Sequence, residues 1–255
     1  MKVALIQSAL QWENPDANRK SFANKIKSIK EAVDLIVLPE MFTTGFSMHP
    51  QEFAETMEGE TVRWMLEMAD QSRSAICGSV IIKEENHFYN RLIFMLPTGE
   101  MSHYDKRHLF ALAGEDKVYT SGTARLIVDY NGFKICPLIC YDLRFPVFSR
   151  NTEDFDLLIY VANWPKIRTN AWDILLSARA VENMCYTIGV NRVGVDANSH
   201  EYIGHSQVVD FLGNYVHEPQ EKEGIFIVEL VKDMLIESRR KLAFLDDRDD
   251  FTVLN

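Results

Sequence analysis

The sequence alternates continuously apolar runs with stretches that carry a helical stripe, and this alternation restricts the fold class more than any other feature. Residues 1–7 (MKVALIQ) and 34–40 (DLIVLPE) are such runs, which are typical of strands buried on both faces. Between them, the segment 16–33 places four apolar side chains on one side of a helix: Phe22, Ile26, Ile29 and Val33. Because helices that connect buried strands produce parallel sheets, the sequence predicts an α/β protein.

The second half of the sequence repeats the order of the first half. FKIC at 133–136 corresponds to MKVA at 1–4, and FDLLIYVANWP at 155–165 corresponds to VDLIVLPEMF at 33–42. The helix expected over 172–186 carries its own apolar stripe, which consists of Ile174, Ala178, Val181 and Cys185. These matches predict two similar halves whose sheets pack face to face with helices outside. Chance similarity between α/β segments is the alternative.

No linker rich in glycine, serine or proline separates the two halves, so residues 1–255 are expected to form a single domain. A chain of this length can bury about three quarters of its unfolded surface around one core. Residues 244–255 combine acids with scattered large apolar side chains. They are either a solvated tail or an arm that contacts a partner subunit.

The charge of the chain and its first residues limit its partners. A formal net charge of -10 argues against nucleic acid, because nucleic-acid-binding proteins usually carry a basic face. The run at 1–10 is too short and too polar for a signal peptide or a membrane span, so no membrane partner is expected. A cytoplasmic location follows as the expectation, with four reduced cysteines: Cys77, Cys136, Cys140 and Cys185.

Three strands are expected to end in ionisable residues. Glu40 ends the run 34–40, Lys106 follows the strand after PTGE, and Cys140 ends FKICPLIC. In α/β folds the reactive groups gather at the carboxyl ends of strands. A thiol becomes a nucleophile when a base or a positive charge lies beside it. We therefore expect Cys140 to lie in a strained elbow between a strand and a helix, with its sulfur exposed to substrate.

These cysteines and the neighbouring histidines also admit other interpretations. An unpaired cysteine is most often a small buried apolar residue, and packing is the expectation for Cys77 and Cys185. Cys136 and Cys140 would lie about 13 Å apart along a strand, too far to share a metal ion. His103 and His108 flank Lys106 and leave a Cys-His hydrolase as an alternative. Two further histidines lack a third ligand at metal spacing: His200 and His205. No metal and no cofactor are expected.

Five segments in order, LPEMFTTGF, YDKRHLF, ICYDLRFP, YVANWP and SARAVENMCY, resemble the nitrilase superfamily of carbon-nitrogen hydrolases, and particularly its omega-amidase branch. The similarity extends from the first strand to beyond Gln207. It implies a four-layer αββα sandwich with an internal pseudo-two-fold repeat, in agreement with the repeat in the sequence. It also implies a homodimer joined across helical faces near the nucleophile.

The resemblance further implies a Glu-Lys-Cys triad. Glu40 in LPE matches the base of the family, Lys106 in YDK its lysine and Cys140 in ICYD its nucleophile. Glu115 in LAGED matches a second glutamate beside the triad and is expected to orient Lys106 or the substrate amide. Glu40 would take the thiol proton, while Lys106 and the backbone N–H of Tyr141 would stabilise the tetrahedral oxyanion.

The substrate pocket is expected to draw on further residues. Arg144 would begin the helix behind Cys140 and bind a substrate carboxylate, although a structural ion pair with Asp142 or another acid is an alternative. Asn163 and Trp164 would form another wall. Two more aromatic residues either add apolar surface to the pocket or belong to the core: Phe42 and Trp172.

The expected activity is hydrolysis of the terminal amide of a small carboxylate-bearing substrate to acid and ammonia through a thioester. The branch implies omega-amides of 2-oxo acids, such as 2-oxoglutaramate and 2-oxosuccinamate, with water as the second reactant. A nitrile, an N-carbamoyl amino acid or acyl transfer to an amine are alternatives on the same fold. A non-catalytic module that binds a partner protein is the alternative from another class.

Overall fold

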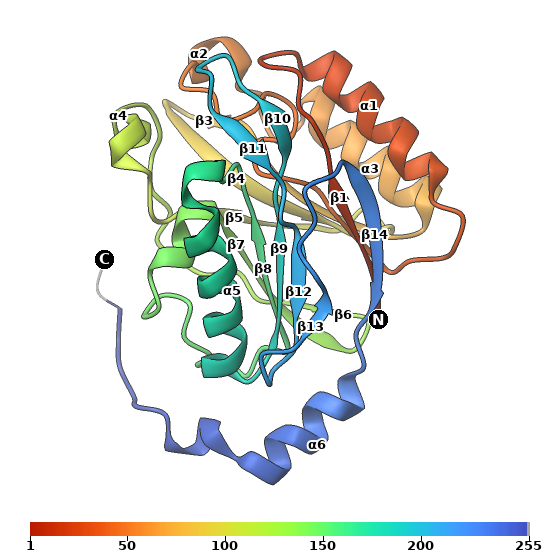
Figure 1. The fold of residues 1–255 in the computed structure, drawn as a ribbon. Helices are drawn as coiled ribbons and strands as arrows, with labels where there is room; N and C mark the ends of the chain where they lie inside the picture. The colour runs from red at the N-terminus through yellow and green to blue at the C-terminus, as the bar shows by residue number, and fades with distance from the viewer. Residues whose placement is uncertain (254–255) are drawn as a thin grey trace.

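The computed structural model describes residues 1–253, and its centre is a pair of six-stranded sheets (Figure 1). The strands of the first sheet, in spatial order, are β14 (Gly224–Glu229), β1 (Lys2–Gln7), β2 (Leu35–Val37), β3 (Ala75–Glu84), β4 (His87–Met95) and β5 (Met101–Asp105). Those of the second are β13 (Tyr215–His217), β12 (Gln207–Val209), β9 (Tyr186–Val190), β8 (Leu157–Val161), β7 (Phe133–Ile139) and β6 (Val128–Tyr130). β10 (Val193–Val195) and β11 (Glu201–Ile203) form a separate ribbon.

Six α-helices and four short 3₁₀ helices connect these strands within the described residues. The α-helices are α1 (Pro15–Ser28), α2 (Pro50–Phe53), α3 (Glu60–Ser72), α4 (Glu115–Val118), α5 (Thr169–Asn183) and α6 (Lys232–Leu242). The 3₁₀ helices are η1 (Ala111–Ala113), η2 (Cys140–Arg144), η3 (Lys166–Arg168) and η4 (Phe244–Asp247). Within residues 1–253, none of the helices has both the length and the apolar character needed to cross a bilayer.

The two sheets have the same pairing pattern. β1, β2 and β3 run parallel and are followed by antiparallel β4, as β7, β8 and β9 are followed by antiparallel β12. Local hydrogen bonds repeat as well: the amide of Asp34 donates to the carbonyl of Lys2 at 2.8 Å, and that of Asp156 to the carbonyl of Lys134 at 2.7 Å. The predicted internal repeat is therefore confirmed.

Alternation along the strands produces the layers of the sandwich. Val3 and Leu5 of β1 belong to the core between the sheets, whereas Ala4 and Ile6 pack with Phe22 of α1 in an outer core. In Figure 1, α1 and α3 cover the outer face of the first sheet, and α5 lies on the outer face of the second. The four-layer αββα architecture thus follows from strands that are apolar on both faces.

Two helix predictions need correction. α1 ends at Ser28, so Ile29 and Val33 lie beyond it. In α5, Ile174 and Val181 are 57% and 47% exposed, so the predicted stripe is wrong. The residues that α5 buries are Trp172, Leu176, Arg179, Ala180 and Asn183.

Two contacts explain why α5 turns this other face inward. Trp172 and Leu176 pack so closely on β9 that a side chain at Gly189 would overlap both of them. Arg179 also faces inward, because its Nη2 donates to the Leu143 carbonyl at 2.6 Å. A stripe chosen from apolar residues alone could not reveal the hydrogen bond of Arg179 or the close packing at Gly189.

Candidate active site

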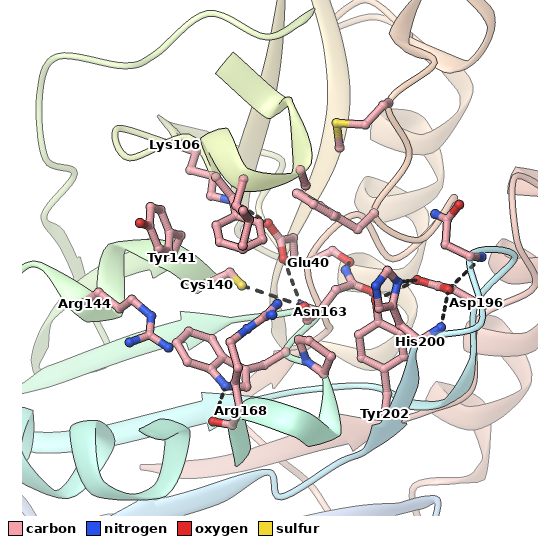
Figure 2. A pocket seen from close by; sticks show the side chains of 18 residues that line it. Glu40, Lys106, Cys140, Tyr141, Arg144, Asn163, Arg168, Asp196, His200 and Tyr202 are labelled. Atoms are coloured by element: carbon pink, nitrogen blue, oxygen red, sulfur yellow. Dashed lines mark hydrogen bonds and ion pairs between the residues drawn. The ribbon is translucent and has the colours of Figure 1, made fainter. Parts of the chain in front are cut away.

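The three predicted strand ends meet at one cavity of about 230 Å³. Glu40 follows β2 and Lys106 follows β5 of the first sheet, whereas Cys140 directly follows β7 of the second. All three side chains line the cavity, and Figure 2 shows them pointing toward one another. The site therefore lies at the carboxyl ends of strands from both sheets, and each sheet contributes to it.

Lys106 is held between two carboxylates, and we call Glu40, Lys106 and Glu115 the charge cluster. Its Nζ lies 2.8 Å from Oε1 of Glu40 and 3.0 Å from both carboxylate oxygens of Glu115. Asn90 of β4, which the sequence did not reveal, donates from Nδ2 to Glu40 at 2.8 Å and to Glu115 at 3.2 Å. The backbone N–H of Phe110 donates to Glu115 at 2.5 Å.

Burial and charge act against each other in this cluster. Burial alone would lower the pKa of Lys106, but the carboxylates of Glu115 and Glu40 outweigh it and raise the pKa above its ordinary value. For Glu115, burial raises the pKa, the charge of Lys106 opposes this shift, and the charge of Glu40 adds to it. Lys106 therefore stays protonated, and such an ammonium could stabilise an oxyanion formed in the cavity.

Glu40 is also fixed from the second sheet. Its Oε2 accepts the backbone N–H of Asn163 at 2.8 Å, and Nδ2 of Asn163 donates to the backbone carbonyl of Glu40 at 2.6 Å. The thiol of Cys140 lies 4.0 Å from the carbonyl oxygen of Asn163. Asn163 therefore contacts both Glu40 and Cys140 and connects them across the two sheets.

Cys140 has a backbone φ of 43°, in the left-handed region that side chains with a Cβ usually avoid. This conformation matches the predicted elbow. The predicted helix beginning at Arg144 is wrong: η2 starts at Cys140 and ends at Arg144. Phe145 leaves the helical region because Pro146 follows it and excludes that conformation at the preceding residue.

The environment keeps the Cys140 thiol protonated. Burial raises its pKa well above the ordinary value, the Glu40 carboxylate raises it further, and only Lys106 acts in the opposite direction. A buried thiol of this kind cannot wait as a thiolate, so nucleophilic attack requires a base that takes its proton. Glu40 lines the same cavity as the thiol and its carboxylate raises the pKa of the thiol, so it is placed to be that base.

Asp142 links the loop of Lys106 to the elbow of Cys140. Its buried carboxylate accepts hydrogen bonds from the Tyr104 hydroxyl at 2.8 Å, from the backbone N–H of Ile139 at 3.0 Å and from that of His108 at 3.0 Å. Nδ1 of His108 lies 2.8 Å from the same carboxylate. Asp142 is thus fully used by other donors, and the alternative in which it pairs with Arg144 is wrong.

Asp142→Asn is expected to lower the free energy of unfolding by about 2–4 kcal/mol, because an amide presents N–H groups to donors that need an acceptor. Urea denaturation measures this difference. Asp129→Asn, at an exposed position of β6, is the matched control and should leave stability unchanged within error. Equal stability of the two variants would show that the Asp142 carboxylate is not the link described above.

The structure sorts the remaining predicted residues. Tyr141, Arg144, Asn163 and Trp164 all line the cavity. Phe42 and Trp172 do not line it, so the alternative in which they belong to the core is the correct one.

Both aromatic rings are fully buried against other apolar groups. Phe42 packs edge-on against Phe22 in the outer core, and Trp172 lies behind Trp164 at a ring distance of 5.4 Å. Neither His103 nor His108 lines the cavity, and His108 instead stacks on Phe145 at 3.7 Å.

Several lining residues were missed from the sequence. They come from the loop after β2, from η1 and η3, and from the β10–β11 ribbon: Phe46, Met48, Phe110, Leu112, Arg168, Asp196, Asn198, His200 and Tyr202. From the sequence, His200 is a candidate only for a metal site, but the structure places it in the cavity wall. Within residues 1–253, no group of three or more His, Cys, Asp or Glu side chains is arranged to hold a metal ion.

The fold and the triad-lined cavity define the class of protein. The family model described as Carbon-nitrogen hydrolase matches residues 2–240, and the chain belongs to this family. The resemblance seen in the sequence is thereby confirmed, as is the sandwich fold.

Individual relatives match the chain over all or nearly all of its length. The Omega-amidase YafV of Yersinia enterocolitica is 41% identical over 255 residues, which are 100% of this chain and 99% of that protein. The 2-oxoglutaramate amidase of Bacillus subtilis is 29% identical over 96% of each chain. The crystal structure of XC1258 from Xanthomonas campestris, a CN-hydrolase superfamily protein with an arsenic adduct in its active site, superposes with a TM-score of 0.97 at 41% identity, covering 99% of this chain and 98% of that chain.

Proposed function

We propose that the protein is an amidase that hydrolyses omega-amides of 2-oxo acids, such as 2-oxoglutaramate or 2-oxosuccinamate, to the acid and ammonia. The observation that carries the proposal is the convergence of Glu40, Lys106 and Cys140 in one cavity whose wall also contains two arginines, Arg144 and Arg168. Similarity to Omega-amidase YafV and to 2-oxoglutaramate amidase supports this substrate class.

In the first half of the reaction, Cys140 attacks the amide carbon while Glu40 takes the thiol proton. The ammonium of Lys106 and the backbone N–H of Tyr141 stabilise the tetrahedral oxyanion. Tyr141 is suited to this role because it is the second residue of η2, where helical N–H groups have no partner within the helix. Glu40 returns the proton to the leaving nitrogen, ammonia departs and a thioester remains on Cys140.

In the second half, Glu40 takes a proton from water, the resulting oxygen nucleophile attacks the thioester, and the acid leaves with the thiol restored. Glu115 does not line the cavity. We therefore assign it to orienting Lys106 rather than the substrate amide. Arg144 binds the substrate carboxylate, since its guanidinium lies over the ring of Trp164 at 5.0 Å and has no acidic partner in residues 1–253.

A substrate panel scored by ammonia release tests the proposal. It contains 2-oxoglutaramate, 2-oxosuccinamate, a nitrile and an N-carbamoyl amino acid. The two 2-oxo acid amides should be turned over fastest, and the N-carbamoyl substrate would also release carbon dioxide. Turnover of the nitrile or the carbamoyl compound alone would contradict the proposal. No turnover of any compound would favour a module that only binds a partner.

We also propose that residues 1–255 act as one domain, which the shared core of both sheets supports, with residues 244–255 as a tail. Residues 254–255 of that tail lie outside the described residues. A cytoplasmic location remains part of the proposal, supported by four free cysteines, and cell fractionation tests it.

We infer a homodimer from exposed apolar side chains on α5, on α6 and after it: Ile174, Val181, Met234, Ile236 and Phe244. α6 and the segment after it extend along the outside of the molecule (Figure 1). Sedimentation velocity should give a dimer for the full chain and a weaker dimer for a chain ending at Ala243. A full chain that sediments as a monomer at micromolar concentration would contradict this inference.

A further inference from the structure

The cavity contains a second unpaired arginine, Arg168, which no motif in the sequence revealed. It is the last residue of η3, as Arg144 is the last residue of η2, and both side chains line the cavity. Figure 2 shows both arginines on the side of the cavity where Cys140 lies. Neither guanidinium forms an ion pair within residues 1–253, although the chain contains 37 aspartates and glutamates against 27 lysines and arginines.

Most buried or half-buried arginines of this protein do have acidic partners. Arg91 pairs with Asp105 at 2.7 Å, and Arg239 pairs with Asp156 at 3.2 Å. Arg168 is half-buried at the cavity wall and has no such partner within residues 1–253, whereas Arg144 is exposed. The guanidinium of Arg168 in particular therefore calls for another explanation. A ligand that supplies the missing negative charge provides one.

Aromatic rings hold the two guanidinium groups in place. Arg144 lies over Trp164, and Arg168 lies over Phe110 at 5.1 Å. The indole Nε1 of Trp164 also donates to the backbone carbonyl of Arg168 at 2.8 Å, which fixes the end of η3. A guanidinium held by its flat face keeps the N–H groups at its edge available for planar acceptors.

We propose that Arg168 is a specificity-determining residue which, together with Arg144, binds the carboxylate and the adjacent oxo group of the substrate and rejects amides that carry an ammonium group at that carbon. This inference rests on the proposed function. A 2-oxo acid presents only acceptor atoms at this end, which suits two guanidinium forks. An amino acid amide such as glutamine would place a positive charge beside two others, which is unfavourable in a confined cavity.

Asp196, which reaches the cavity wall from the β10–β11 ribbon, does not offset the rejection of substrates that carry an ammonium group. Asp196 lines the cavity, but its carboxylate accepts hydrogen bonds from the Tyr202 hydroxyl at 2.8 Å and from the backbone N–H groups of Asn198 and His200 at 2.9 Å each. These donors lower its pKa against the opposing effect of burial. Its oxygens are therefore committed to the ribbon and are poor acceptors for a substrate ammonium.

The test compares 2-oxoglutaramate, L-glutamine and the uncharged pentanamide with the wild type and Arg168→Gln. The variant should lower kcat/KM for 2-oxoglutaramate by about 10- to 100-fold, mainly through KM, as the loss of a charge-assisted hydrogen bond predicts. Its kcat/KM for pentanamide should stay within about threefold of the wild-type value, because pentanamide has no carboxylate or oxo group for Arg168 to bind. The preference of the enzyme for 2-oxoglutaramate over L-glutamine should shrink. Arg168→Lys should keep the rejection of glutamine, because the charge remains, but recover only part of the affinity.

Lys166→Gln is the matched control, since it removes a positive charge from the same 3₁₀ helix. Lys166 pairs with Glu201 at 2.9 Å and does not line the cavity. The control should behave like the wild type with all three amides. If Arg168→Gln lowers kcat/KM for all three equally, or leaves the value for 2-oxoglutaramate unchanged, Arg168 does not determine specificity.

A binding measurement separates this inference from the proposed function. Calorimetry with 2-oxoglutarate and Cys140→Ala, with and without Arg168→Gln, requires no turnover. Weaker binding in the double variant supports the role of Arg168 even if the wild type hydrolyses no amide, an outcome that would refute the proposed function alone. Unchanged binding refutes the role of Arg168 even if 2-oxoglutaramate is a good substrate.

Discussion

Replacing Cys140 by alanine is expected to lower ammonia release by at least about 10⁴-fold, because the nucleophile of a covalent mechanism cannot be bypassed by the groups around it. The fold should change little, since the thiol makes a single long contact, 4.0 Å to the carbonyl of Asn163. Rapid acid quenching of the wild-type reaction, followed by mass spectrometry, should reveal an acyl group on the peptide that contains Cys140.

Cys136→Ala is the matched control for this experiment. Cys136 lies on β7, the strand that directly precedes Cys140; it is fully buried and does not line the cavity. Its replacement should reduce stability by about 1–2 kcal/mol through the small cavity it leaves, while turnover persists. A Cys140→Ala enzyme that kept more than a tenth of the wild-type rate would exclude the thioester mechanism.

Replacing Lys106 by methionine is expected to damage both activity and stability. The variant loses the oxyanion donor, which should lower kcat by about 10²- to 10³-fold or more. It also leaves Glu40 and Glu115 facing each other in a buried site without a cation, which should lower the free energy of unfolding by about 3–5 kcal/mol. Kinetics and urea denaturation measure the two effects, and Lys117→Met, at an exposed position of α4, is the control.

The loss of stability in Lys106→Met should depend on pH. Burial raises the pKa of Glu115, and Lys106 is the charge that opposes this shift, so its removal raises the folded-state pKa further. A carboxyl whose folded-state pKa is raised contributes stability below its unfolded value of 4.5 and loses it as pH rises through the folded value. The deficit should therefore be smallest in acid and grow toward neutral pH. A deficit independent of pH would mean that the charge cluster does not act as described.

The triad could be predicted because each of its members ends a strand. Strand ends are visible in a sequence, and α/β topology brings the carboxyl ends of neighbouring strands together. The resemblance then selected Glu40, Lys106 and Cys140 among the ionisable residues. The repeat was visible for a similar reason, since buried strands are continuous apolar runs.

The pocket wall could not be predicted in the same way. Arg168 and Tyr202 reach the cavity from η3 and from the β10–β11 ribbon, and the paths of such short connections depend on what they pack against. Phe42 follows β2 and Trp172 lies in α5, but both turn into the core, where their apolar rings are fully enclosed. The inward face of α5 differs from the predicted stripe because Arg179 makes hydrogen bonds that compensate for its burial.

The positive φ at Cys140, and that of 41° at Met41 directly after Glu40, set a limit on how robust this enzyme can become. Each costs about 1–2 kcal/mol relative to a relaxed backbone, and glycine would remove most of that cost. At position 140, replacement by glycine would remove the backbone strain but would also remove the reactive thiol. Selection for thermal tolerance should therefore accumulate changes elsewhere in the two sheets and leave this bend untouched.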